Sequence, residues 1–160
     1  MDSRFEIRFD RAALAGAFGV SEQDIQEYMT DGRRASFIIE RRLKWDNPDW
    51  QLAPSERAGF DLIDPNGSRW EVRCITKRGV YFNPSKQVGS GRVFDEAEFL
   101  NKLRSVAGFL LADVTKFPVV PVFKCSVDYV FDWHRRRLLG AKARVSYAAF
   151  YRRLLPTIRW

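Results

Sequence analysis

Histidine and cysteine are both scarce in this sequence. His134 is the only histidine, and Cys74 and Cys125 are the only cysteines. Zinc sites need Cys and His ligands at short spacings, and many nucleophilic triads need a histidine as base, so the composition argues against both kinds of site. Both cysteines lie in apolar, strand-like runs. We therefore expect two buried free thiols rather than a disulfide, which fits a reducing cytoplasm.

Long apolar runs are also missing. No stretch approaches the roughly 18–20 apolar residues of a membrane-spanning helix, so we expect no membrane partner. The first residues are charged and lack the apolar region of a signal peptide, which predicts a cytoplasmic protein. The 160 residues are 46% apolar and 29% charged, as in one soluble globular domain. Within residues 1–160 we expect a helical segment (1–32), a core (33–127) and a basic helical end (128–160).

Acidic residues are absent from the last part of the chain. From Trp133 onward there are eight Lys or Arg residues and no Asp or Glu, whereas the preceding residues carry nineteen basic and twenty acidic side chains. The net charge of +7 therefore comes from this segment. A basic segment of this kind favours a polyanionic partner such as nucleic acid, although a solvated helix face gives the same pattern.

Apolar periodicity predicts an α/β fold with a mixed central β-sheet flanked by helices. Continuous apolar runs at 108–114 and 119–127 indicate strands that are buried on both faces. In the third helix we expect Phe37, Ile38 and Leu43 to face inward. The expected helices are two within 11–28, then 33–44, 95–106, 128–138 and 145–155, and the expected strands are 59–64, 69–77, 108–114 and 119–127, with loops at 45–58 and 78–94.

The first two helices resemble a helix-turn-helix. Ala15, Gly19 and Ile25 fall where that motif wants a small residue, a turn glycine and an apolar core residue. A DNA-reading second helix would enter the major groove, but this one is acidic and would repel phosphates. We therefore favour a structural or dimer-forming helical pair, with a DNA reader as the alternative. Leu14, Phe18 and Val20 would supply the apolar surface of a dimer.

An acidic pair stands on a predicted hairpin. Asp61 and Glu71 flank Pro65-Asn66-Gly67-Ser68, a strong turn signal that would bring the two carboxylates together. Mg²⁺ prefers oxygen ligands of this type and could activate water beside a phosphate. The alternative is two exposed acidic residues on an ordinary hairpin. Glu40, on the preceding helix, is either half of a helix ion pair or a group near the metal.

These residues resemble the PD-(D/E)XK nuclease superfamily, and most closely its small type II restriction endonucleases. The resemblance rests on Asp61 followed ten residues later by Glu71-Val72-Arg73, and it covers residues 33–127 as the catalytic core. It implies a restriction-endonuclease-like core and Mg²⁺-dependent hydrolysis of double-stranded DNA at a short specific sequence. Asp61, Glu71 and the carbonyl of Val72 would hold the metal, and Glu40 would lie beside it. A homodimer is expected if the DNA site is palindromic.

One position departs from the family pattern. The third catalytic residue is normally lysine, and here it is Arg73, which holds phosphate charge but cannot act as a base. Lys77 shares its strand face but lies roughly 13 Å away. The resemblance places DNA-contacting groups in the loop 83–92. The DNA-binding candidates are Lys77, Arg78, Lys86, Gln87, Ser90 and Arg92.

Two other functions remain open at this level. A sequence-specific DNA-binding protein with a helix-turn-helix and a degenerate nuclease core would bind DNA without cutting it. A repair or structure-selective nuclease would cut branched or single-stranded DNA without a fixed sequence.

Overall fold

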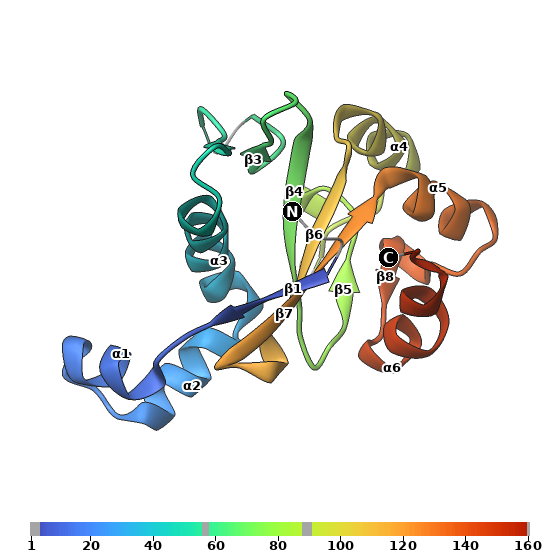
Figure 1. The fold of residues 1–160 in the computed structure, drawn as a ribbon. Coiled ribbons are helices and arrows are strands. Elements are labelled where there is room, and N and C mark those ends of the chain that lie inside the picture. The colour runs from blue at the N-terminus through green and yellow to red at the C-terminus, as the bar shows by residue number, and fades with distance from the viewer. Residues whose placement is uncertain (1–3, 56–57, 88–90, 160) are drawn as a thin grey trace.

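The computed structural model describes residues 4–55, 58–87 and 91–159, and it confirms an α/β fold built on a mixed sheet (Figure 1). The six strands run in the order β1-β7-β6-β4-β3-β2, and a second sheet pairs β5 with β8. The strands are β1 (Arg4–Arg8), β2 (Gln51–Leu52), β3 (Leu62–Ile63), β4 (Arg69–Ile75), β5 (Val80–Tyr81), β6 (Gly108–Asp113), β7 (Val119–Ser126) and β8 (Arg144–Val145). The α-helices are α1 (Arg11–Phe18), α2 (Glu22–Thr30), α3 (Gly32–Asp46), α4 (Glu96–Ser105), α5 (Val127–Arg135) and α6 (Tyr147–Ala149).

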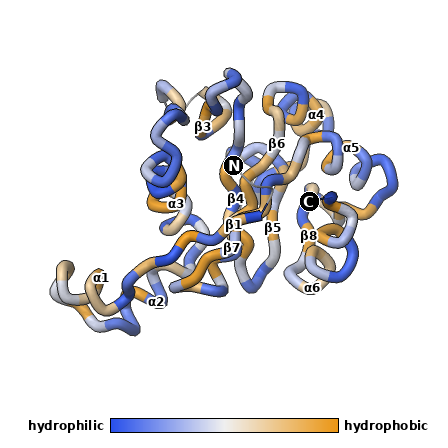
Figure 2. The backbone as a smooth tube through the Cα atoms, in the orientation of Figure 1, coloured by the Kyte–Doolittle hydropathy of each residue, from blue (hydrophilic) through white to orange (hydrophobic). Residues whose placement is uncertain are grey.

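Two apolar cores lie on opposite faces of the sheet. One contains α3 side chains together with Trp70 and Val72, and the other contains α4, α5 and C-terminal side chains together with Ile75. Figure 1 shows α3 on one side of the strands and α4 and α5 on the other, and Figure 2 shows the strands between them to be largely apolar. Every residue of β6 is buried, as its continuous apolar sequence predicts. A Cβ at Gly108 would stand 2.2 Å from the Cys125 carbonyl oxygen, so this strand also needs a glycine.

The connection between β3 and β4 is the expected turn, but the hairpin is shorter than predicted. Asp64 Oδ1 accepts from the backbone N–H groups of Asn66 and Ser68, both at 2.9 Å, and Gly67 has φ +79°. Only Leu62–Trp70 and Ile63–Arg69 are paired between the strands. β4 pairs with β6 along Trp70–Ile75, so its other edge has no strand partner beyond Trp70 in the described residues. This open edge positions the candidate site.

Side-chain caps begin both helices of the N-terminal pair. Asp10 caps α1, Ser21 and Asp24 form a capping box on α2, and Gly19 makes the left-handed turn between them. Figure 1 shows this pair at one end of the molecule, away from α4 and α5. Phe18 is 71% exposed and Val20 is 45% exposed. The sequence did not indicate β1, which precedes the pair and forms an edge strand against β7.

Four expectations about elements need correction. Phe37 does not face inward, because it is 52% exposed; Ala35, Ile39 and Leu43 form the buried stripe of α3. The expected loop 45–58 begins two residues later, because α3 extends to Asp46, and it contains β2. The expected loop 78–94 contains β5 and a 3₁₀ turn at Ser85–Gln87. The last helix is irregular, with a π-helical turn at Phe150–Leu154 after α6.

Both cysteines are free, as predicted, and Cys125 is buried while Cys74 is partly buried. Burial raises the pKa of the Cys74 thiol to about 12. In the described part of the chain, no helix combines the length and the apolar character needed to cross a membrane.

Candidate active site at the open edge of strand β4

Asp61 occupies the edge of β4 where β3 would otherwise continue. Its backbone N–H donates to the Trp70 carbonyl at 2.9 Å, which extends the hairpin ladder by one bond. The next bond along this edge is made by the Asp61 side chain, whose Oδ2 accepts from the Val72 N–H at 2.7 Å. A carboxylate thus replaces a backbone carbonyl at this position. The hairpin brings Asp61 beside Glu71, as the sequence predicts.

Glu71 is buried, with 5% of its surface exposed, and it contacts two cations. Arg73 Nη2 lies 2.8 Å from Glu71 Oε1, and Lys102 Nζ from α4 contacts Glu71 Oε2. Lys102 also donates to the Gly59 carbonyl. The side chains of Arg73 and Lys102 are only 14% and 10% exposed, so all three charges are largely removed from water. Such a cluster persists only when its charges compensate one another.

Lys102 is the main residue that the sequence did not point to. It comes from α4, thirty-one residues after Glu71, so no local motif joins the two. Helical periodicity does contain a signal: Lys102 follows the buried Phe99 by three residues and precedes the buried Leu103, so it borders the inward face. A lysine at that border either extends its ammonium group to solvent or meets an acidic partner in the fold.

Glu40 reaches the same site from α3. Burial is the main cause that raises the pKa of its carboxyl to about 7, and the nearby Asp61 and Glu71 charges add to it while Arg41 opposes it. Arg41 Nη1 lies 3.4 Å from Glu40 Oε2. Glu40 therefore forms the helix ion pair that the sequence left open, and it also lies in the acidic group with Asp61 and Glu71.

The pKa of Asp61 is also raised, to about 6. Burial is again the largest cause, the Glu71 charge adds to it, and the Val72 N–H partly offsets both. Three carboxylates thus lie in one partly dry region, where burial and mutual repulsion raise the pKa of Glu40 and of Asp61. Repulsion among carboxylates that share one site is the condition that a bound cation relieves.

The residues fit Mg²⁺ in the chemistry of their donors. Asp61 and Glu71 supply carboxylate oxygens, and the Val72 carbonyl lies on the same edge of an extended strand as the Val72 N–H that Asp61 binds. Among the described residues, no three acidic, histidine or cysteine side chains are arranged as a ready cage for a metal. Mg²⁺ usually keeps several waters and uses one or two carboxylates, so it does not need such a cage.

The loop after β5 braces the site. Arg73 Nη2 donates to the Asn83 carbonyl at 2.9 Å, and Asn83 Nδ2 donates to the Gln87 carbonyl at 3.2 Å. Gln87 Nε2 in turn donates to Glu98 of α4 at 2.7 Å. Because α4 also carries Lys102, the contacts close a ring from Arg73 through the loop and α4 to Glu71. Gln87 is buried within this ring and faces the protein interior rather than solvent.

The other predicted DNA-contacting residues are scattered. Lys86 is exposed and pairs with Glu98 at 2.6 Å, and Arg92 is exposed and donates to the Lys86 carbonyl. Lys77 and Arg78 are exposed in the turn after β4, about 20 Å along the strand from Glu71 by residue spacing. Ser90 lies outside the described residues. The structure therefore groups Lys86 and Arg92 near the bracing loop and leaves Lys77 and Arg78 at the far end of β4.

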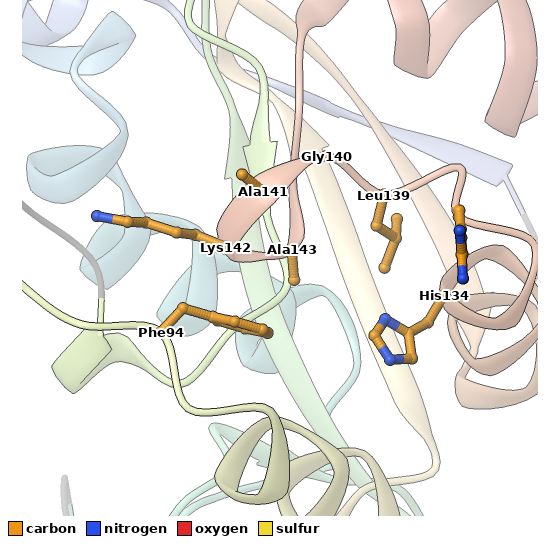
Figure 3. Close-up of a pocket in the computed structure, with 8 residues that line it drawn as sticks. Phe94, His134, Leu139, Gly140, Ala141, Lys142 and Ala143 are labelled. Atoms are coloured by element: carbon orange, nitrogen blue, oxygen red, sulfur yellow. The ribbon is translucent and has the colours of Figure 1, made fainter.

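A separate hollow lies beside the basic loop after α5. Figure 3 shows Phe94 near Ala143 and His134 near Leu139, with Lys142 pointing away from the ring of His134. None of the carboxylates of the β4 edge lines this hollow. His134 Nε2 lies 2.8 Å from Glu96, so this histidine ties α5 to α4.

Comparison with known proteins gives no match for this chain among protein-family models, curated sequences or solved structures.

Proposed function

We propose that this protein is a Mg²⁺-dependent endonuclease of the PD-(D/E)XK type that hydrolyses double-stranded DNA at a short specific sequence. One observation carries the proposal: Asp61, Glu71 and Glu40 converge with Arg73 and Lys102 at the open edge of β4. The mixed sheet with helices on both faces is compatible with a restriction-endonuclease-like core. The net charge of +7 suits a polyanionic substrate.

Each side chain has a role that follows from its chemistry. Asp61 and Glu71, with the Val72 carbonyl, would hold Mg²⁺, and Glu40 would adjust the charge beside it. Bound Mg²⁺ supplies Lewis-acid stabilisation of phosphate charge and acidifies water. Arg73 stays protonated, so it stabilises negative charge on the phosphate and does not take a proton. Lys102 supplies the ammonium group that Arg73 does not provide, from α4 rather than from β4.

The role of Lys102 predicts a specific loss. Lys102→Met keeps the length and apolar stem of the side chain but removes its charge, so cleavage should fall by about 10²–10³-fold, as when one transition-state donor is removed. Lys102→Arg restores a cation and should recover part of the rate. Single-turnover cleavage of a fixed duplex measures both variants. Full activity of Lys102→Met would show that this lysine only neutralises Glu71.

The proposal itself is tested by digesting long unmethylated double-stranded DNA with Mg²⁺ and with EDTA, and by sequencing the ends. Discrete fragments with one common end sequence would support it. A palindromic sequence would further support a homodimer, for which the exposed Phe18 and Val20 of the α1–α2 pair are the proposed interface. Uncut DNA that still shifts on a gel would favour the non-catalytic DNA-binding alternative.

One observation favours the non-catalytic DNA-binding alternative. Both oxygens of Glu71 already contact a cation in the described structure, so a metal has to compete with Arg73 and Lys102 for this carboxylate. A repair or structure-selective nuclease is the other alternative, and cleavage without a common end sequence would favour it.

A further inference from the structure

An exposed aromatic and basic face runs along α3. Trp45 is 81% exposed and Phe37 is 52% exposed, and they are eight residues apart on the same helix. Arg41 lies between them, with its guanidinium 3.5 Å from the centre of the Phe37 ring. The buried stripe of Ala35, Ile39 and Leu43 lies on the opposite side of the helix. The aromatic rings are therefore directed to solvent by the helical repeat itself.

Charge on this face is mainly positive. Arg33, Arg34, Arg41 and Lys44 carry it. Of the acidic neighbours, Asp31 lies 3.7 Å from Arg34, Glu40 pairs with Arg41 and Asp46 pairs with Arg42. A surface hollow is lined by Arg41, Lys44, Trp45 and Pro48. Lys44 Nζ donates to the Pro48 carbonyl at 2.6 Å, which holds this ammonium at the rim. One indole ring and two cations thus surround a single depression.

The face begins at the candidate active site. Glu40 belongs to the acidic group of the β4 edge, and it lies one helical turn after Phe37 and one turn before Lys44. Trp45 is five residues further, which is about 7–8 Å along the helix axis and about 140° around it. Arg41 joins the two regions, because it contacts Glu40 and also lines the hollow with Trp45. A nucleic-acid strand with one phosphate at Glu71 and Lys102 would have its neighbouring nucleotides within reach of this face.

We propose that the α3 face binds an unpaired nucleobase and its flanking phosphates next to the scissile bond. The base stacks on Trp45, and Arg41 and Lys44 contact the phosphates. Stacking requires the flat side of a base, which a duplex hides, so the ligand is a single-stranded end, a junction or a base turned out of the helix. The ligand class rests on the proposed function, since it assumes that the strand is nucleic acid.

The test is direct binding of a labelled single-stranded 12-mer and its duplex, measured by fluorescence anisotropy in EDTA. Trp45→Ala should weaken single-strand binding about tenfold or more, because stacking on one aromatic residue contributes that much per base. The duplex should lose much less. Trp45→Phe keeps a ring and should retain most of the binding, whereas Trp45→Leu keeps apolar area without a ring and should behave like Trp45→Ala. Trp45 is exposed, so circular dichroism should show all three variants folded.

Several results would overturn the inference. Equal single-strand binding by Trp45→Ala and the wild type would remove the stacking role, and so would an equal loss for single strand and duplex. Wild-type dimers that become monomers in Trp45→Leu or Trp45→Ala would assign the face to a protein contact instead. If the wild type cuts duplex DNA with Mg²⁺ while Trp45→Ala binds single strands normally, the proposed function stands and only this inference fails. If the wild type binds neither DNA, both fail.

Discussion

Asp61→Asn is expected to lower DNA cleavage by more than about 100-fold while the protein stays folded. Loss of an outer partner of a metal ligand costs up to about 100-fold, and Asp61 is proposed as a ligand itself. The Val72 N–H donates to Asp61 at 2.7 Å, and asparagine retains a carbonyl oxygen that can accept this bond. The local structure at the edge of β4 should therefore be kept. Single-turnover cleavage at saturating enzyme measures the loss, and a gel shift in Ca²⁺ or EDTA should show that DNA still binds.

The same variant should be more stable than the wild type above neutral pH. Asp61 has a folded-state pKa of about 6 against an ordinary value of 3.8, so the folded protein holds a proton that the unfolded chain has lost. The contribution of Asp61 to the wild-type free energy of unfolding therefore falls as pH rises from about 4 to about 6. Asparagine does not titrate. The difference in the free energy of unfolding between the variant and the wild type should therefore shift by about 1–3 kcal/mol in favour of the variant from pH 4 to pH 8.

Urea unfolding at pH 4.5 and pH 8 measures this difference. Glu40→Gln is a matched control, because its folded-state pKa is raised to about 7 for related reasons and its stability should shift in the same direction. A variant that loses stability at pH 8 would mean that the Asp61 charge supports the fold rather than opposing it. Cleavage by Asp61→Asn at the wild-type rate would reject the metal-ligand role.

The hairpin and its acidic pair were predictable because the signals are local. Pro65-Asn66-Gly67-Ser68 specifies a turn, and the side chain of Asp64 forms the hydrogen bonds that such a turn needs. The caps Asp10, Ser21 and Asp95 lie immediately before their helices for the same reason. In each case the residues that interact are separated by only a few positions in the chain.

The rest of the site depends on contacts between distant segments. Lys102 meets Glu71 only after α4 packs on the sheet, and Gln87 becomes a brace only because Glu98 lies above it. From the sequence alone, a polar residue such as Gln87 in a glycine-rich loop is expected at the surface, because its distant partner is not apparent. Phe37 was misplaced for a related reason, because apolar character alone does not distinguish a core side chain from an exposed ring beside arginine.

Glu71→Ala is expected to lower the free energy of unfolding by about 3–5 kcal/mol, the cost of breaking a buried ion pair by removing one partner. It leaves Arg73 and Lys102, whose side chains are 14% and 10% exposed, without the carboxylate that both contact. For a domain of 160 residues the melting temperature should fall on the order of 10 °C. Scanning calorimetry at pH 7 measures it.

Glu71→Gln provides the matched control for that change. It keeps the size of the side chain and one acceptor oxygen, so its loss of stability should be smaller, at about 1–3 kcal/mol. Sulfate should recover part of the stability of Glu71→Ala, because an anion can take the place of the missing carboxylate between the two cations. A melting temperature of Glu71→Ala equal to that of the wild type would show that Arg73 and Lys102 reach solvent once released. With the expected loss, absent cleavage by Glu71→Ala would not identify a catalytic residue, and Asp61→Asn becomes the variant that separates chemistry from folding.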